Sequence, residues 1–140
     1  MVGLGPGARS YTRALHYSSE YAVGRPGILD IIADYNSRTS QQFAEADYGC
    51  ELDAQEQRRR YVLKSLLRSD GLDLAAYASF FGTEVFDDFP QLSELLEEGL
   101  AVEGEGRLWL TAAGVELSDV IGPWLWSARV RERMDEFALR

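Results

Sequence analysis

Near the start of the chain, hydrophobic positions recur with helical spacing in one short stretch only. Four apolar residues share one face of a predicted helix: Ile28, Ile31, Ile32 and Tyr35. Asn36 can end this helix, and residues 36–50 are polar and typical of a loop. Residues 1–26 are rich in glycine and show no regular period. The pattern therefore predicts a single helix between two irregular segments.

From Asp53 onward the pattern predicts helices with clear start and stop signals. Asp53 and Glu56 have the spacing of a capping box, in which each side chain can bond the other residue's free backbone N–H. Gly71 is placed to stop this helix, whose buried stripe has four members: Val62, Leu63, Leu66 and Leu67. A second helix is predicted between a cap at Asp73 and a stop at Gly82.

The same signals predict a third helix and a strand pair. The third helix runs from about Asp88, with Pro90 in its first turn, to Gly99. Alternating apolar residues then predict two short strands, with Leu100 and Val102 in the first and Leu108 and Leu110 in the second. Residues 103–106 (Glu-Gly-Glu-Gly) have the composition of the turn between them.

Two further helices are predicted after the strands. Thr111 can cap the fourth, which ends at Gly122-Pro123. The fifth carries one apolar stripe: Trp126, Val130, Met134 and Phe137. Three helices followed by a hairpin are the order of a winged helix, which we assign to about residues 52–122, and we expect the last helix to pack on it.

The predicted fold class is therefore mainly α with a small β-hairpin (α+β), divided into two parts. Residues 51–140 form a winged-helix-like C-terminal domain that includes the terminal helix. Residues 1–50 are too short and too rich in glycine to fold alone. We interpret them as a remnant of a neighbouring domain.

The net charge of the chain and its distribution limit the classes of partner that we expect it to bind. The chain of 140 residues has a net charge of −9, and residues 83–122 hold ten acidic residues and one basic residue. The predicted third helix has no lysine or arginine, so its approach to DNA phosphates would be repulsive, and we expect no nucleic-acid partner. The only basic run, Arg58–Arg60, is interpreted as a solvated helix face.

Other composition features exclude several classes of protein. The single cysteine, Cys50, excludes a disulfide framework and a cysteine-rich metal site within these residues. No apolar run is long enough to span a membrane, and no secretion signal pattern is present, so we expect a cytoplasmic protein without a membrane partner.

The strongest local motif is Gly3-Leu-Gly-Pro-Gly7. Alternating glycines let a backbone approach a ligand closely, and their N–H groups can cradle an anion. For the pattern by itself, a tight strand-to-loop turn or packing against a larger domain is the favoured interpretation. Arg9 or Arg13 could pair with a ligand carboxylate. The lone His16 has no partner pattern of a catalyst, so we predict no catalytic residue and no metal ligand in this chain.

Several motifs, in the same order, resemble one family. Gly3-Leu-Gly-Pro-Gly-Ala-Arg-Ser-Tyr11 is similar to the GLGxGA(R/H)SY segment of radical SAM proteins like oxygen-independent coproporphyrinogen III oxidase. Further matching pieces follow downstream: Leu67-Arg68 with Gly71-Leu72-Asp73, Phe81-Gly82, Leu95-Leu-Glu-Glu-Gly-Leu100 and Leu110-Thr-Ala-Ala-Gly114. Together they extend over most of residues 2–122.

The resemblance implies a division of labour. In the family, an N-terminal partial (β/α) barrel holds a [4Fe–4S] cluster through a C-x₃-C-x₂-C motif and binds S-adenosylmethionine. Residues 2–11 would correspond to the edge of that barrel, with Gly3, Gly5 and Gly7 on the cofactor side and Arg9, Ser10 and Tyr11 toward substrate. The barrel is then the implied missing partner, and a tetrapyrrole-like molecule the implied substrate.

The implied reaction is oxidative decarboxylation of porphyrinogen propionates in porphyrin and haem biosynthesis. This chain lacks the cluster cysteines, so alone it is expected to hold no cofactor and to be inactive. It also has Ser18-Ser19 where many relatives carry an asparagine, which puts an identical substrate in doubt. The alternative is a non-catalytic module, either for haem handling or for protein interaction through an acidic winged helix.

Overall fold

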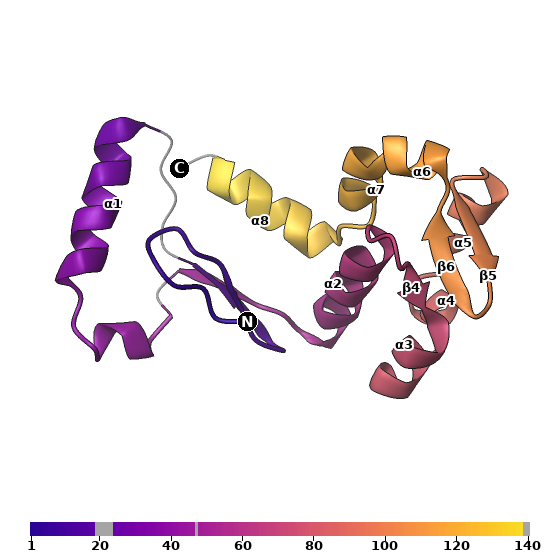
Figure 1. The fold of residues 1–140 in the computed structure, drawn as a ribbon, viewed down its shortest axis with the longest axis horizontal. Helices are drawn as coiled ribbons and strands as arrows, with labels where there is room; N and C mark the ends of the chain where they lie inside the picture. The colour runs from indigo at the N-terminus through magenta and orange to yellow at the C-terminus, as the bar shows by residue number, and fades with distance from the viewer. Residues whose placement is uncertain (19–23, 47, 139–140) are drawn as a thin grey trace. The chain divides into compact units, whose positions relative to one another are not determined.

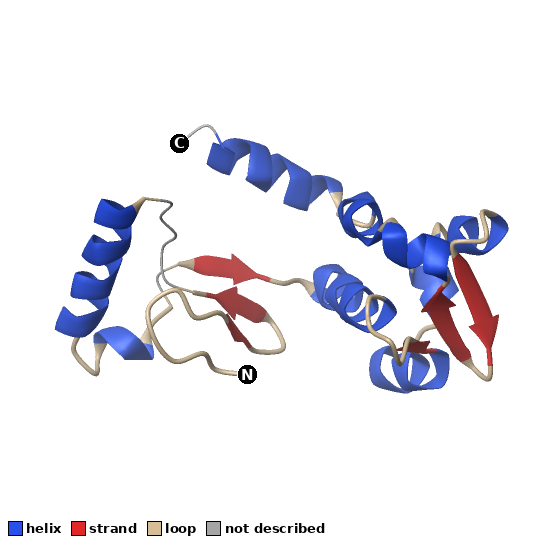
Figure 2. Ribbon diagram, turned by 45° about the horizontal axis from the view of Figure 1, so that its top comes forward, coloured by secondary structure: helices blue, strands red, loops and turns tan. Residues whose placement is uncertain are grey.

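The computed structural model describes residues 1–18, 24–46 and 48–138 (Figure 1). The chain divides into two compact units, Met1–Gln57 and Arg58–Arg140, and each is described by itself. The sequence places this boundary after residue 50. The described residues form eight α-helices and two three-stranded antiparallel sheets, so the fold is mixed α and β, with more strands than the one predicted hairpin (Figure 2).

The first unit is built around a small antiparallel sheet. Its strands lie in the order β1 (Ser10–Tyr11), β2 (Leu15–Tyr17) and β3 (Gly49–Glu51). At Gly49 a Cβ would come within 2.3 Å of the His16 carbonyl oxygen, so only glycine fits this close approach. The prediction of irregular structure is wrong at these strands, because two or three residues are too few to show an alternating pattern.

Helix α1 (Arg25–Ser37) contains the predicted helix and ends one residue after Asn36. No residue of α1 is buried, and Ile28 and Leu29 are 46% and 54% exposed. The predicted apolar face is therefore present, but the described residues of the unit cover only part of it, at Ile31 and Tyr35. The 3₁₀ helix η1 (Gln42–Ala44) follows in the segment predicted as a loop.

The second unit has a continuous apolar core. Twelve buried residues form it: Val62, Leu66, Leu72, Tyr77, Val85, Phe89, Leu92, Leu95, Ala101, Leu108, Ile121 and Leu125. They come from the helices and their ends, from strand β4 and from both strands of the predicted hairpin. Burial of this set is the main favourable free-energy contribution in the unit.

Helix α2 (Ala54–Leu66) starts at the predicted place. The Asp53 carboxylate accepts a hydrogen bond from the Glu56 N–H at 2.9 Å, which is one of the two bonds of a capping box. The helix ends at Leu66, before Gly71, because residues 67–70 form a turn that brings the chain back toward the core. Gly71 has a φ of 69° and lies in that turn.

Helix α3 (Leu74–Phe81) confirms both predicted ends. Asp73 accepts a hydrogen bond from the Ala76 N–H at 2.8 Å, and Gly82 has a left-handed φ of 74°. The predicted third helix is present as α5 (Leu92–Glu97), which begins four residues after Asp88, and a further short helix that was not predicted, α4 (Val85–Asp88), precedes it. Pro90 separates the two, since it disfavours helical backbone at Phe89 before it.

The second sheet contains the predicted hairpin and one further strand. β5 (Ala101–Gly104) and β6 (Arg107–Leu110) are joined at Glu105 and Gly106, whose φ values of 49° and 72° suit a two-residue hairpin turn. Strand β4 (Leu72–Asp73) pairs with the other side of β6, giving the order β4-β6-β5. Its two residues are too few to be recognised as a strand from sequence.

Three helices complete the second unit, where two were predicted. Thr111 caps α6 (Ala112–Glu116) by accepting a hydrogen bond from the Gly114 N–H. The helix breaks at Leu117, and α7 (Ser118–Trp124) includes Pro123 in its last turn. Helix α8 (Ala128–Ala138) buries none of residues 128–136, so the expected packing on the core is wrong for these residues. The side chain of Phe137 lies outside the described part.

Candidate functional site

The glycine-rich loop of the first unit adopts a backbone that requires glycine. Gly5 and Gly7 have φ values of 105° and 76°, which side chains disfavour. At Gly3, a Cβ would lie 2.7 Å from the carbonyl oxygen of Arg9. These constraints alone explain the alternating glycines as a tight turn before β1.

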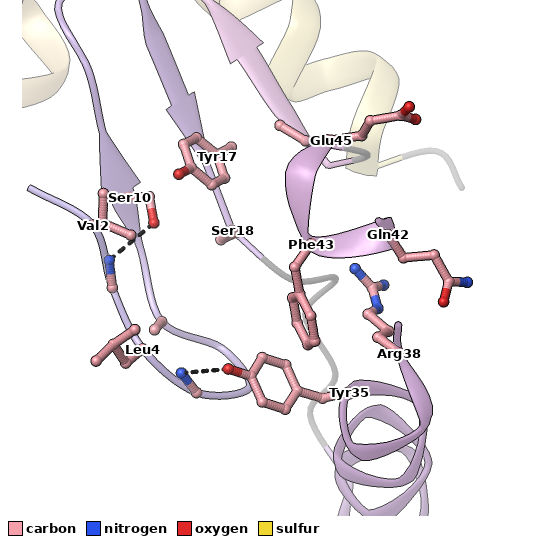
Figure 3. A pocket seen from close by; sticks show the side chains of 14 residues that line it. Val2, Leu4, Ser10, Tyr17, Ser18, Tyr35, Arg38, Gln42, Phe43 and Glu45 are labelled. Carbon is pink, nitrogen blue, oxygen red and sulfur yellow. Dashed lines mark hydrogen bonds between the residues drawn. The ribbon is translucent and has the colours of Figure 1, made fainter. Parts of the chain in front are cut away.

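Two of the loop amides are engaged within the unit. The Gly3 N–H donates to Ser10 Oγ at 3.0 Å, and the Gly5 N–H donates to the Tyr35 hydroxyl, also at 3.0 Å (Figure 3). In this conformation these amides cannot also cradle an anion. The hydroxyl oxygens of Ser10 and Tyr35 instead fix the loop to β1 and to α1.

A pocket of about 270 Å³ lies beside this loop, within the first unit (Figure 3). Three of the residues proposed from sequence line it: Gly3, Gly5 and Ser10. The other three, Gly7, Arg9 and Tyr11, do not. Tyr11 stacks on His16 at 4.4 Å between ring centroids and, as the neighbour of Ser10 on β1, points to the other face of the sheet.

The pocket is completed by residues that the sequence did not indicate. Tyr35 and Phe43 form an aromatic wall, with their rings edge-to-face at 5.0 Å, and Arg38, Gln42 and Glu45 lie around it. Arg38 is oriented by an ion pair between its Nε and Asp34 Oδ2 at 2.9 Å. Tyr35 was visible in the sequence only as a member of a helical apolar face, and no motif links it to the loop.

The polar groups of the pocket are mainly hydrogen-bond donors. Ser10 is only 3% exposed, and its hydroxyl accepts the Gly3 bond. Within the described residues neither the Ser10 nor the Tyr35 hydroxyl donates a hydrogen bond, so each retains a proton for a ligand acceptor. The pocket thus offers two hydroxyl donors beside an aromatic wall.

The second unit contains a converging polar cluster around Asp88. Oδ2 of Asp88 accepts hydrogen bonds from the Tyr77 hydroxyl at 2.7 Å and from the Thr83 hydroxyl at 2.6 Å, and it forms an ion pair with Arg58 Nε at 3.1 Å. Burial by itself raises the pKa of Asp88. These hydrogen bonds and the Arg58 charge lower it by more than burial raises it, so the pKa lies below its ordinary value of 3.8.

This cluster connects α2, α3 and α4 and adjoins no described pocket. Burial and the Asp88 carboxylate raise the pKa of Tyr77, so its hydroxyl remains a donor. Arg59 lies over the Phe89 ring at 5.0 Å and donates to the Leu125 carbonyl oxygen. The interpretation of Arg58 and Arg59 as a solvated face is therefore wrong, because both side chains support the core.

Residues 52–117 match the family model described as the HemN C-terminal domain. This segment is a HemN C-terminal domain. The match confirms the resemblance derived from the sequence and is consistent with the C-terminal region of a HemN-like radical SAM protein. Comparison with curated proteins and with solved structures gave no match. The glycine-rich loop and its pocket lie outside the matched residues.

The shared motifs within the HemN C-terminal domain serve packing. At Gly114 a Cβ would lie 2.0 Å from the Leu100 carbonyl oxygen, so α6 can reach β5 only with glycine there. Thr111 caps α6 and also donates to the Gly99 carbonyl oxygen at 2.9 Å. At Gly71 a Cβ would lie 2.5 Å from the Trp109 ring. These positions therefore support the packing of the domain.

Within residues 1–18, 24–46 and 48–138, no group of three histidine, cysteine or acidic residues could hold a metal ion. His16 and Cys50 are register partners on β2 and β3 but have no third such ligand beside them. None of the helices in these ranges is both long and apolar enough to cross a lipid bilayer.

Proposed function

We propose that this chain is the C-terminal region of a radical SAM oxidoreductase related to oxygen-independent coproporphyrinogen III oxidase. The HemN C-terminal domain at residues 52–117 is the observation that supports this most strongly. In the proposal, the first unit is the edge of a partial (β/α) barrel that lies in another segment. The second unit is a winged-helix-like domain, in agreement with its helices followed by the β4-β6-β5 sheet.

The residues present do not fit a [4Fe–4S] cluster. Such a cluster needs several thiolate ligands, and this chain has only Cys50. The cluster and S-adenosylmethionine chemistry would therefore belong to the barrel. The part assigned to this chain is to hold and orient a bound molecule.

The pocket of the first unit is suited to holding and orienting a bound molecule. Its volume of about 270 Å³ is near the lower end of the range for small-molecule sites, which is roughly 300–1,000 Å³, so it would hold one portion of a larger ligand. The hydroxyls of Ser10 and Tyr35 can donate to acceptor atoms of that portion. Phe43 offers a ring face or edge beside them. Oxidative decarboxylation of a porphyrinogen propionate is the reaction we assign to the complete protein.

The first test is the coding sequence upstream of this segment. We expect a C-x₃-C-x₂-C motif in the same reading frame, and its absence there and from any companion protein would contradict the proposal. The protein containing both parts, reconstituted with its cluster without oxygen, should cleave S-adenosylmethionine and release CO₂ from coproporphyrinogen III. The 140-residue chain alone should do neither.

The second test compares substitutions in the complete protein. Removing the pocket hydroxyl with Ser10→Ala should raise the substrate or S-adenosylmethionine KM by about tenfold, the equivalent of one hydrogen bond to a charged or polar group. Arg9→Ala tests the carboxylate-binding role that the resemblance implies, with the exposed Arg25→Ala on α1 as its matched control. Unchanged binding in Arg9→Ala would remove Arg9 from the site.

A second candidate function is a protein-interaction module. The second unit favours it through exposed acidic residues on α5 and the β5-β6 turn: Glu94, Glu97, Glu98, Glu103 and Glu105. A basic partner should then lose affinity when Glu97 and Glu98 are changed to lysine. If this double change affects neither the activity of the reconstituted protein nor its binding to any partner, the enzymatic function alone would be favoured.

A further inference from the structure

The two hydroxyl groups beside the glycine-rich loop are both oriented by the loop itself. Ser10 Oγ accepts a hydrogen bond from the Gly3 N–H, and the Tyr35 hydroxyl accepts one from the Gly5 N–H (Figure 3). Because the loop amide occupies one lone pair of each oxygen, the hydroxyl proton has to point in another direction. A hydroxyl that accepts one hydrogen bond is also a stronger donor in the next, since linked hydrogen bonds polarise one another.

The hydroxyl proton of Ser10 is left without an acceptor in an enclosed place. Ser10 is only 3% exposed and lines the pocket of the first unit. Its oxygen donates to no atom of residues 1–18, 24–46 and 48–138. Native proteins rarely leave a buried donor unused, because the lost hydrogen bond is unfavourable. The pocket therefore favours a ligand that presents an acceptor atom to Ser10.

The charges around the pocket favour a negatively charged acceptor. Arg38 lines the pocket, and its side chain is only 22% exposed. Two acidic residues oppose it: Asp34, which pairs with Arg38 and has a 60% exposed side chain, and Glu45, which lines the pocket and is also exposed. Water and salt screen exposed charges more than enclosed ones. The positive charge of Arg38 therefore prevails inside the pocket.

Phe43 offers a surface for the remainder of the ligand. Its ring lies edge-to-face with Tyr35, at 5.0 Å between centroids, and Phe43 is still 49% exposed. An exposed ring in a pocket wall gains from contact with a second flat ring. The pocket volume of about 270 Å³ has room for one ring with a short side chain, and is below the range typical of larger ligands.

We propose that this pocket binds a carboxylate carried by a short chain on a planar ring. The carboxylate accepts hydrogen bonds from the Ser10 and Tyr35 hydroxyls and is attracted by Arg38, while the ring packs against Phe43. The inference rests on the proposed function, because it states which part of the ligand this chain holds. It places the carboxylate away from Arg9, which does not line the pocket.

The test titrates the full 140-residue chain with two matched probes, 3-phenylpropionate and its uncharged amide, 3-phenylpropionamide. Amide signals in NMR spectra report binding. The wild-type chain should bind the carboxylate at least about tenfold more tightly than the amide, because hydrogen bonds to a charged acceptor are stronger. The largest shifts should occur at Gly3 and Gly5, whose N–H groups bond the two hydroxyls.

Substitutions in the pocket should lower this preference for the carboxylate. Ser10→Ala, Tyr35→Phe and Arg38→Gln each remove one hydroxyl or the charge, and each should bring the two dissociation constants closer together by about tenfold. A merely loosened loop would weaken both probes alike and leave their ratio unchanged. The ratio therefore separates loss of a ligand contact from loss of structure.

Matched variants outside the pocket are the controls. Ser79→Ala, Tyr61→Phe and Arg25→Gln remove the same chemical groups from residues that do not line it, and should leave the ratio unchanged. Glu45→Gln has the opposite expected sign. Because it removes a negative charge from the pocket lining, it should tighten binding of the carboxylate and leave that of the amide unchanged.

Equal affinity of the wild-type chain for the two probes would overturn the inference, because the pocket would then not select a charged acceptor. Absence of binding up to the solubility limit of 3-phenylpropionate would do the same, as would a ratio that all three pocket substitutions leave intact. The proposed function fails by a different result, in which the complete protein with its cluster does not cleave S-adenosylmethionine. Probe binding by the chain together with an inactive complete protein would contradict the proposed function alone.

Discussion

The two units differ most in what they bury. The second unit has twelve buried apolar side chains in one core, whereas no described apolar residue of the first unit is buried. The first unit is held by hydrogen bonds along three short strands and by the contacts of its glycine-rich loop. Since burial of apolar surface dominates folding free energy, stability resides in the second unit.

The pocket lies in the less stable unit. Its wall is formed by the glycine-rich loop, strands β1 and β2, the 3₁₀ turn and the C-terminal part of α1, and its polar groups include the Ser10 and Tyr35 hydroxyls. Binding surfaces are often built from segments of low local stability, because a fully packed core leaves no room for a ligand. The second unit therefore supplies the stable core, and the first unit supplies the pocket.

The largest expected effect is loss of a core side chain in the second unit. Leu108 on β6 is fully buried, and Leu108→Ala should lower the free energy of unfolding by about 2–5 kcal/mol. Ile28→Ala on α1 removes a similar side chain that is 46% exposed and should cost less than about 1 kcal/mol. Urea titration monitored by far-UV circular dichroism, which reports the helices of both units, measures both, and equal losses would contradict the comparison.

A second substitution tests close packing at a glycine. Gly114→Ala places a Cβ against the Leu100 carbonyl oxygen and should destabilise the second unit by about 1–3 kcal/mol or more. Gly122→Ala is the matched control, because no atom lies within 4 Å of a Cβ there and alanine favours the helical backbone of α7. The control should be neutral or slightly stabilising. A neutral Gly114→Ala would refute the packing role of the motif.

The third substitution concerns the Asp88 cluster. Asp88→Asn keeps the shape but removes the charge that faces Arg58, and should cost about 1.5–3 kcal/mol at neutral pH. Asp87→Asn, at an exposed neighbour, should cost almost nothing. Unfolding transitions of the three proteins measured at pH 7 check this order.

The same cluster makes stability depend on pH. The folded-state pKa of Asp88 is below 3.8, so its contribution is complete well above pH 3.8 and is lost as pH falls through the folded pKa. Asp88→Asn should therefore flatten the acid side of the stability curve between about pH 5 and 2. A curve identical to that of the wild type would show that other groups cause the acid loss.

The sequence predicted the second unit well where local signals agree with packing. Asp73 and Gly82 bound α3 as expected, and the Glu105-Gly106 turn joins the predicted strands. The third helix starts at Leu92 rather than at about Asp88, because Pro90 disfavours helical backbone at Phe89, and the short helix α4 before it was not predicted. Strand β4 was missed because its pairing with β6 depends on contacts distant in sequence.

The site in the first unit could be predicted only in part. Gly3, Gly5 and Ser10 line the pocket because the glycine pattern marks a turn before a strand. Tyr35 and Phe43 reach the same pocket from segments far along the chain, which no local motif reveals. The alternation of side chains along β1 turns Tyr11 away from Ser10, and recognising this required the strand that the sequence did not show.

Native-state hydrogen exchange tests the central claim most directly. Amides of α2, α3 and β6 should exchange only through global unfolding of the second unit, because they adjoin its core. Amides of β1, β2 and β3 should exchange at least about 100-fold faster, through local opening. Equal protection of the two sets would contradict the account, since it would show that the first unit shares the stability of the core.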